Sequence, residues 1–238
     1  MSEGRALLDR VAIVTGASRG IGRAVARTFA CAGARVVMIA RGADVLRREA
    51  EPLDALAIAC DVTDPAAVDA ALRRVRAERG EPSIVVNNAG IFHLAPVEAT
   101  TPDSLRQTLE VNLVAPFLLT RAALPAMRAA RGGDVVTIGS IADRATFPEN
   151  AAYAASKFGA RAVHQVLREE LRGSGVRCTL VSPGPVDTSL WDPVRPDERD
   201  GFTPRARMLR AEAVAEAVLF AVTRPPDVNV DELRLSRA

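Results

Sequence analysis

The fold is decided by one stretch near the start of the chain, Val11-Ala12-Ile13-Val14-Thr15-Gly16-Ala17-Ser18-Arg19-Gly20-Ile21-Gly22. Its first five residues form a short apolar run of β-formers, which predicts a buried strand. From Ile21 onward the apolar side chains recur on one face of a helix, which Gly33 ends. The glycines between these two elements allow backbone N–H groups to approach a pyrophosphate, and the helix N-terminus adds partial positive charge. The stretch therefore predicts a nucleotide-binding turn between a first strand and a first helix.

The same alternation of strand and helix continues along the chain. Strands are expected at 11–15, 35–40, 55–60, 83–86, 134–138, 176–181 and 228–233. Helices are expected at 21–32, 43–51, 65–79, 102–131, 151–172 and 211–223, with bends at Pro116 and Pro125 in the fourth. This order predicts an α/β protein of the Rossmann type, a doubly wound parallel sheet of about seven strands with helices on both faces. No linker or repeat divides it, so we expect residues 1–238 to form a single domain, with a substrate loop at about 187–207.

Composition places the chain among ordinary globular proteins and disfavours several classes of function. Hydrophobic residues make up 48% and charged residues 25% of the 238 residues, and the net charge is +2. A charge this small creates no long-range field toward nucleic acid or a membrane surface. The N-terminus lacks the apolar run of a signal peptide, and no stretch approaches the roughly 18 apolar residues expected of a membrane span. Cys31, Cys60 and Cys178 are far apart, so we expect a cytoplasmic protein without a disulfide framework or a metal site.

Two of the residue types that occur only once stand four residues apart. Tyr153 is the single tyrosine and Lys157 the single lysine, while every other basic residue among the 31 is arginine. On the predicted helix these two side chains share a face, about one turn apart. A nearby ammonium stabilises a phenolate and lowers the pKa of a tyrosine from its usual value of about 10. The pair therefore predicts an acidic phenol that exchanges a proton with a carbonyl or alcohol oxygen.

The glycines and the Tyr–Lys pair belong to a larger set of motifs. The glycine spacing is Gly-x-x-x-Gly-x-Gly, and later come Asn87-Asn88-Ala89-Gly90, Tyr153-x-x-x-Lys157 and Pro183-Gly184, with Ser140 placed 13 residues before Tyr153. In kind, order and spacing these segments resemble the short-chain dehydrogenase/reductase family, from residue 11 to about residue 232. The resemblance implies an oxidoreductase that transfers a hydride between a nicotinamide cofactor and a carbonyl or secondary alcohol.

The resemblance also implies roles for individual residues. Tyr153 would be the general acid and base, Lys157 would also hold the nicotinamide ribose, and Ser140 would hydrogen-bond the substrate oxygen. Asn112 would hold a water that links Lys157 to solvent. The residues implied to contact the cofactor are Gly16, Ser18, Arg19, Gly20, Ile21, Gly22, Arg41, Asp61, Val62, Asn88, Ala89, Gly90, Tyr153, Lys157, Pro183, Gly184, Val186 and Thr188.

The choice between NAD(H) and NADP(H) depends on the charge at the end of the second strand. An acidic residue there binds the ribose hydroxyls of NAD, whereas the 2′-phosphate of NADP needs a cation. The strand ends in Ile39-Ala40-Arg41-Gly42, without an acid, and Arg19 adds a second cation in the glycine turn. Two guanidiniums can bind a phosphate through charge-assisted, bidentate bonds. We therefore predict NADP(H) as the cofactor.

Two alternatives to a reductase of small carbonyl compounds stay open. One is a module that senses NADPH without turnover, although such a module has no need for the Ser140, Tyr153 and Lys157 set. The other is a 3-oxoacyl-thioester reductase, although the chain lacks the Gly-Gly pair that such enzymes often carry after the last strand. The arginines that could recognise an acidic carrier protein are Arg128, Arg131, Arg168 and Arg172.

The surroundings of the predicted site are less determined. His93 could line the substrate cleft or lie in a solvated loop, and His164 is expected to serve packing or face solvent. Trp191, the only tryptophan, is expected either to cover the pocket or to anchor its loop. The resemblance and the small side chains of the 151–172 helix imply a homotetramer or homodimer formed through the two long helices.

Overall fold

A parallel sheet of seven strands forms the centre of the computed structural model, which describes residues 5–238. The strands are β1 Val11–Thr15, β2 Arg35–Ala40, β3 Leu56–Ala59, β4 Ile84–Asn87, β5 Gly133–Ile138, β6 Val176–Pro183 and β7 Glu232–Leu235. They lie in the order β3-β2-β1-β4-β5-β6-β7, and each neighbouring pair is parallel. The winding direction therefore reverses between β1 and β4, where doubly wound sheets bind ligands at the carboxyl ends of their strands. The predicted fold class is confirmed.

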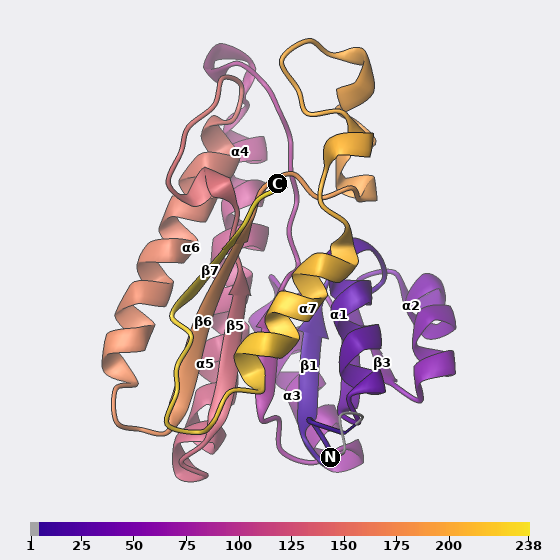
Figure 1. The fold of residues 1–238 in the computed structure, drawn as a ribbon, viewed down its shortest axis with the longest axis vertical. Coiled ribbons are helices and arrows are strands. Elements are labelled where there is room, and N and C mark those ends of the chain that lie inside the picture. Colours follow the sequence, from indigo (N-terminus) through magenta and orange to yellow (C-terminus); the bar gives the residue numbers. More distant parts are fainter. Residues whose placement is uncertain (1–4) are drawn as a thin grey trace.

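Helices cover both faces of the sheet (Figure 1). The helices are α1 Gly20–Cys31, α2 Ala43–Ala50, α3 Pro65–Glu78, α4 Pro102–Leu109, α5 Ala115–Ala129, α6 Ala151–Glu170 and α7 Ala211–Val222. Apolar side chains of α1, α2 and α7 pack on one face, and those of α3, α5 and α6 pack on the other. The sheet is thus a middle layer, and its strands are buried on both sides.

The strand side chains alternate between the two cores because their period along a strand is two. In β1, Ala12 and Val14 point into the core under α1 and α7, whereas Val11 and Ile13 point into the core under α3 and α5. All five residues of β1 are buried, as the continuous apolar run predicted.

The expected helix over 102–131 contains a change of winding. It consists of α4, a π-helical turn at Glu110–Val114 and then α5. Pro116 stands just after the turn and has no N–H to donate to the carbonyl four residues earlier, which belongs to Asn112. The predicted irregularity near Pro116 is therefore a π turn, whereas Pro125 lies inside α5.

The last strand begins later than expected. The apolar pattern predicts a strand at 228–233, but β7 spans Glu232–Leu235. Before it, the side chain of Asn229 accepts from the N–H of Cys178 at 2.9 Å and donates to its carbonyl at 3.1 Å. A side chain here takes the hydrogen bonds that a strand backbone would make, so regular pairing with β6 starts only at Glu232.

One helical segment, Pro102–Ala129, is long and apolar enough to cross a membrane by length and composition alone, which the sequence analysis did not anticipate. In α5 the side chains of Ala115, Leu119, Ala123 and Met127 are buried in the core on the sheet. This pattern is that of a core helix packed on a sheet.

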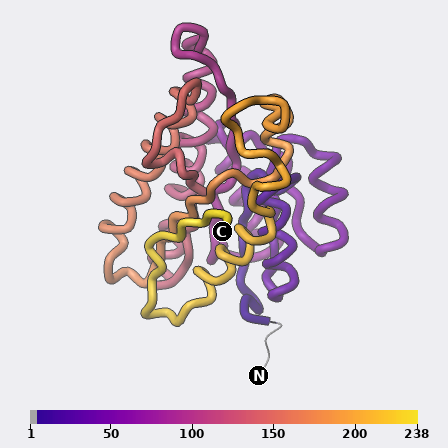
Figure 2. The backbone as a smooth tube through the Cα atoms, turned by 45° about the horizontal axis from the view of Figure 1, so that its top comes forward, coloured from indigo at the N-terminus to yellow at the C-terminus, as the bar shows by residue number. Residues whose placement is uncertain are grey.

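The carboxyl edge of the sheet carries the longer loops (Figures 1 and 2). The segment 187–207, drawn in orange, rises above this edge and contains three short 3₁₀ turns. The loop after β4 rises on the same edge. The functional site is built where these loops meet the strand ends.

Candidate active site

A cleft of about 1220 Å³ opens at the carboxyl edge of the sheet, at the switch point between β1 and β4. Residues from the ends of six strands, β1 to β6, line it. The predicted cofactor and catalytic residues converge on this one cleft. Those that line it are Gly16, Ser18, Arg19, Gly20, Ile21, Arg41, Asp61, Val62, Asn88, Ala89, Gly90, Ser140, Tyr153, Lys157, Pro183, Gly184, Val186 and Thr188.

The glycine turn has the tight backbone that a bound pyrophosphate requires. Gly16 and Gly20 have positive φ angles of 63° and 53°, which side chains rarely tolerate. Gly22 lies behind the turn, and a Cβ there would stand 2.5 Å from the carbonyl oxygen of Gly16. A side chain at Gly22 would therefore push the glycine turn open. Gly22 does not line the cleft, but its lack of a side chain allows the turn to form.

The N-terminus of α1 is open toward the cleft. Its N-cap residue, Arg19, makes no side-chain cap, and the first turn contains no acidic residue. The first N–H groups of the helix are left for another acceptor, and their partial positive charge favours an anion. The donor chemistry of this end fits a phosphate group.

Two arginines stand at this nucleotide end of the cleft. Arg19 and Arg41 are both exposed and line the cleft, and neither forms an ion pair within the described part of the chain, residues 5–238. The carboxylate of Asp61 accepts hydrogen bonds from the backbone N–H of Thr63 at 3.0 Å and from its hydroxyl at 2.7 Å. These bonds hold the pKa of Asp61 below its usual value, and the charge of Arg41 adds to the effect. The edge of the cleft thus presents two available cations beside a fixed carboxylate.

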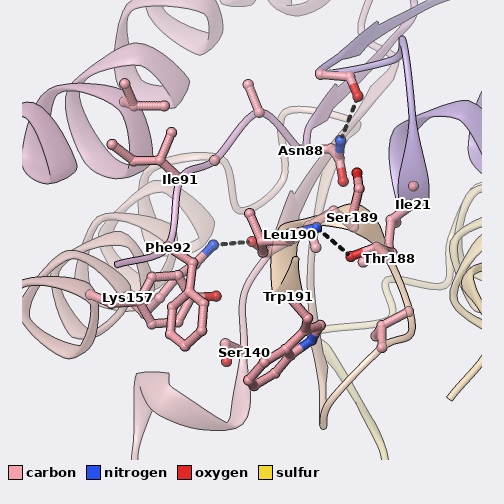
Figure 3. A pocket seen from close by; sticks show the side chains of 18 of the residues that line it. Ile21, Asn88, Ile91, Phe92, Ser140, Lys157, Thr188, Ser189, Leu190 and Trp191 are labelled. Atoms are coloured by element: carbon pink, nitrogen blue, oxygen red, sulfur yellow. Dashed lines mark hydrogen bonds between the residues drawn. The ribbon is translucent and has the colours of Figure 1, made fainter. Parts of the chain in front are cut away.

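The segment after β4 is fixed by Thr15, a residue that the sequence analysis did not single out. The Thr15 hydroxyl accepts from the N–H groups of Asn88 and Ala89, each at 3.0 Å, and the Asn88 side chain donates to the Thr15 carbonyl at 2.8 Å. Figure 3 shows Asn88 at this position. The ends of β1 and β4 are therefore locked together at the switch point. The polar residue at the end of the apolar β1 run was the available signal.

The catalytic end of the cleft holds the predicted set. Ser140 follows β5, and Tyr153 and Lys157 lie one turn apart on α6. Lys157 is 7% exposed, and its Nζ donates to the carbonyl of Ile138 at 2.8 Å and lies 5.6 Å from the centre of the Tyr153 ring. Ser140 and Lys157 both point into the hollow of the cleft (Figure 3). The structure therefore brings together three residues that the motif spacing had grouped.

The predicted acidity of Tyr153 is wrong for the groups of the chain itself. Burial raises the pKa of Tyr153 to about 12; the Ser140 hydroxyl opposes this shift, and the charge of Asp143 adds to it. Burial also lowers the pKa of Lys157 to about 8, with Asp143 acting in the opposite direction. Desolvation penalises the charged form of both groups, and it is the largest cause of each shift. The hydroxyl of Tyr153 is therefore protonated at neutral pH in the protein without a bound cofactor.

Asn112 joins three parts of the site. Its side chain accepts from the N–H of Ile91 at 2.8 Å and donates to the Ile91 carbonyl and the Ser156 hydroxyl, each at 3.0 Å. Ser156 in turn donates to the carbonyl of Tyr153 at 2.7 Å. The side chain therefore positions the loop after β4 against α6. The water that Asn112 is expected to hold stays a prediction.

Asp143 is another residue of the site that the sequence analysis missed. It is fully buried beside Ser140, and its carboxylate accepts from Arg144 at 2.7 Å and from the hydroxyl of Ser182. It also accepts from the backbone N–H of Ser140, which makes a capping box of the turn Ile141–Asp143. The spacing Ser-x-x-Asp was the available signal, because a serine followed three residues later by an acid is the sequence form of such a box.

An aromatic wall borders the catalytic end, formed by Phe92, Trp191 and Phe202. The ring of Phe92 meets Tyr153 edge-on with centroids 4.8 Å apart, and it meets Trp191 at 5.1 Å. The ring of Trp191 meets that of Phe202 edge-on, with centroids 6.4 Å apart. Trp191 lines the cleft, which supports the prediction that it covers the pocket. Phe92 and Phe202 were not predicted, since they lie far apart in sequence.

The remaining candidates lie outside the cleft. His93 is exposed and is not among the residues that line the cleft, whereas His164 is buried on α6. The four arginines proposed for a carrier protein lie at or just after the C-terminal ends of α5 and α6, at the opposite edge of the sheet, and three of them are engaged there. Arg128 donates to the Glu170 carbonyl, Arg168 pairs with Asp231, and Arg172 pairs with Glu169.

Comparison with known proteins agrees with this geometry. The sequence model of the family described as short chain dehydrogenase matches residues 10–199, most of the chain. The chain belongs to the short-chain dehydrogenase family. This short-chain dehydrogenase is 38% identical over 220 residues to D-threitol dehydrogenase of Mycolicibacterium smegmatis, a match that covers 89% of this chain and 85% of that protein. It is 35% identical over 216 residues to the 3-oxoacyl-[acyl-carrier-protein] reductase FabG of Escherichia coli, covering 89% of this chain and 88% of FabG.

Solved structures of the family superpose on nearly the whole short-chain dehydrogenase described here. A metagenomic short-chain oxidoreductase in complex with NADP has a TM-score of 0.85 at 33% identity, covering 98% of this chain and 99% of that one. An alcohol dehydrogenase from the archaeon Thermococcus sibiricus, complexed with 5-hydroxy-NADP, has a TM-score of 0.85 at 29% identity, with 95% of each chain covered.

Proposed function

We propose that this short-chain dehydrogenase is an NADP(H)-dependent oxidoreductase that interconverts a carbonyl and a secondary alcohol, with Tyr153 as the general acid and base. The observation that carries the proposal is the convergence of Ser140, Tyr153 and Lys157 on one cleft. The other end of that cleft is the open N-terminus of α1. A pyrophosphate at that helix end places the rest of a dinucleotide along the strand ends, toward Tyr153.

The residues of the chain act on the substrate oxygen. A bound nicotinamide supplies or accepts the hydride. The Ser140 oxygen accepts from the N–H of Ala142 at 3.1 Å, which leaves its own O–H free to donate to the substrate oxygen. Tyr153 donates its proton to the same oxygen as negative charge develops there. Lys157, held by the Ile138 carbonyl, keeps an ammonium behind the phenol and offers a donor to the ribose.

The pKa of Tyr153 determines which form of the free protein each direction of the reaction starts from. A phenol with a pKa of about 12 is protonated at neutral pH and is ready to donate, whereas alcohol oxidation needs the phenolate. Reduction therefore proceeds from the predominant form of Tyr153. Oxidation draws on a minor form, whose population rises with pH.

The preference for NADP(H) rests on Arg19 and Arg41. Both line the nucleotide end of the cleft without an ion-pair partner in the described residues 5–238. A 2′-phosphate offers them charge-assisted bonds, and β2 ends without the acid that would bind ribose hydroxyls instead. The NADP and 5-hydroxy-NADP complexes of the two solved relatives support this assignment.

The same proposal includes a cytoplasmic homotetramer or homodimer. The two long helices α5 and α6 carry exposed apolar side chains, namely Phe117, Phe158, Val163 and Val166. Large apolar side chains gathered on neighbouring helices are typical of an interface between subunits. The segment 187–207 is proposed as the substrate loop, since Thr188, Leu190 and Trp191 in it line the cleft.

Two kinds of function remain as alternatives. The identity to FabG favours a 3-oxoacyl-thioester reductase, although the arginines proposed for carrier recognition lie at the edge opposite the cleft. In a protein that only senses NADPH, the set of Ser140, Tyr153 and Lys157 would have no chemical function. The test is a panel of ketones and one 3-oxoacyl thioester mixed with the full-length protein and NADPH, with cofactor oxidation followed over time. We expect oxidation with at least one ketone; tight NADPH binding without any oxidation would contradict the proposal.

A further inference from the structure

The substrate end of the cleft has a distinct chemistry. The aromatic wall of Phe92, Trp191 and Phe202 begins at the proton donor itself, because the Phe92 ring is 4.8 Å from that of Tyr153. Each contact along the wall is edge-on, with interplanar angles of 67° to 77°. The three rings come from two separate segments, the loop after β4 and the segment 187–207. A substrate whose carbonyl reaches Tyr153 therefore has its neighbouring substituent against aromatic carbon.

Cations are few at this end of the cleft. Among the described residues that line the cleft, the cations are Arg19, Arg41, Lys157 and Arg199, and only Arg199 stands beside the wall. Its guanidinium pairs with Glu149 at 2.8 Å and lies 4.7 Å from the centre of the Phe202 ring. Lys157 lies behind Tyr153, and the carboxylates of Glu149 and Asp200 also line the cleft, so this end disfavours an acidic substrate. A substrate with many hydroxyl groups would lose hydration against rings that offer few hydrogen bonds in return.

We infer that the substrate of this site is a neutral ketone that carries an apolar ring beside its carbonyl, with an aromatic ring preferred, and that Phe92 and Trp191 bind that ring. This inference rests on the proposed reductase function for its chemistry, whereas the binding of the ring rests on the wall alone. The wall offers ring edges and faces for further edge-on or offset contacts, which favour an aromatic over a saturated ring of similar size.

The single tryptophan gives a direct readout of binding. Trp191 is the only tryptophan in the chain, so all tryptophan emission reports on the wall. The emission of the full-length protein is titrated with acetophenone, with cyclohexyl methyl ketone and with a four-carbon polyhydroxy ketone, in the absence of NADPH. We expect saturable quenching by acetophenone and no saturable change with the polyhydroxy ketone. The absence of saturable quenching by acetophenone would overturn the inference.

Kinetics with NADPH give the second readout. We expect kcat/KM for acetophenone to exceed that for cyclohexyl methyl ketone by about 2- to 10-fold, which is the range of an added aromatic contact. Both ring ketones should exceed the polyhydroxy ketone and a 3-oxoacyl thioester. The inference is overturned if either of the latter two substrates is preferred. If no carbonyl compound oxidises NADPH, the proposed function fails, and the quenching titration alone decides whether the ring site exists.

Variants separate ring binding from loop packing. Trp191→Ala should lower kcat/KM for acetophenone about tenfold or more, with a smaller effect on the polyhydroxy ketone and an unchanged Kd for NADPH, whereas Trp191→Phe should stay within a few-fold of the parent. Phe220→Ala is the matched control, since Phe220 is an exposed aromatic residue on α7 outside the cleft. Equal losses on all ketones in Trp191→Ala would contradict the inference, because they would show that the wall only packs the loop.

Discussion

Asp143 and Ser140 hold one another in the turn that follows β5. The buried carboxylate of Asp143 accepts the backbone N–H of Ser140 at 3.5 Å, while the Ser140 hydroxyl accepts the N–H of Ala142 at 3.1 Å. The same carboxylate accepts from Arg144 and from Ser182 on β6. Ser140 therefore lies beside a buried carboxylate that also raises the pKa of Tyr153 and opposes the lowering of the Lys157 pKa.

The substitution Asp143→Asn is expected to shift the pH dependence of catalysis toward lower pH. In the parent, reduction should decline above about pH 8, where Lys157 loses its proton, and oxidation should rise with pH toward the pKa of Tyr153 at about 12. Removing the negative charge of Asp143 lowers both pKa values. The decline of reduction and the rise of oxidation should therefore both occur at lower pH. The measurement is kcat/KM against pH in each direction. A uniform loss of activity without a shift of either the decline or the rise would mean that Asp143 serves the turn alone.

The selectivity for NADPH over NADH should depend on Arg41. Arg41→Ala removes a cation at the cleft, and the loss of a charge-assisted contact should weaken NADPH binding by about 10- to 100-fold while leaving NADH binding nearly unchanged. Arg48→Ala is the control, because Arg48 is exposed on α2 and does not line the cleft. Dissociation constants for both cofactors decide the matter. If the Arg41→Ala protein kept its full preference for NADPH, this arginine would not bind the 2′-phosphate.

A buried ion cluster at the opposite edge of the sheet should carry stability and no catalytic role. Asp134 is 4% exposed and accepts from Arg10 at 2.7 Å and from Arg177 at 2.8 Å. Asp134→Ala leaves two guanidiniums without their counter-charge, so the free energy of unfolding should fall by about 3–5 kcal/mol. The matched change Asp103→Ala breaks a solvent-exposed pair with Arg106 and should cost less than about 1 kcal/mol. Urea unfolding of the two variants compares them, and equal losses would argue against this account.

His164 should make the protein less stable in mild acid. Its side chain is buried, its Nδ1 has no hydrogen-bond partner among the described residues, and burial lowers its pKa below the ordinary 6.5. The unfolded chain then binds the proton more readily than the folded chain, so stability falls as pH drops through about 6.5. His164→Gln should remove part of the loss in unfolding free energy between neutral pH and about pH 5.5. His93→Gln, at the exposed second histidine, should keep that loss in full, and identical slopes for the two variants would refute the assignment.

The parts of the molecule that were predictable from sequence are those fixed by local pattern. The run Val11–Thr15 and the glycines after it determine a strand, a turn and a helix within a few residues of one another, and the Tyr153–Lys157 spacing is set by one helical turn. β7 was misplaced because the side chain of Asn229 pairs with Cys178, a contact between distant segments.

Burial and distant contacts account for what the sequence could not reveal. The sign of the Tyr153 pKa shift was wrong because desolvation depends on the surrounding fold, whereas the neighbouring lysine is visible in the sequence. The aromatic wall was missed because Phe92 and Trp191 meet only when the loop after β4 and the segment 187–207 close on the same cleft. Asp143 has a readable spacing to Ser140, but its burial and its bond to Ser182 arise from the packing of β5 against β6.

The central claim is that the Tyr153 hydroxyl donates the proton that completes carbonyl reduction. Tyr153→Phe removes that hydroxyl and leaves the ring, its contact with Phe92 and the cofactor end of the cleft in place. NADPH binding and ketone-dependent NADPH oxidation by this variant, measured side by side with the parent, test the claim most directly. We predict a Kd for NADPH close to that of the parent and a loss of turnover of at least about 100-fold, the range of a positioned general acid. Substantial turnover by Tyr153→Phe would contradict the account.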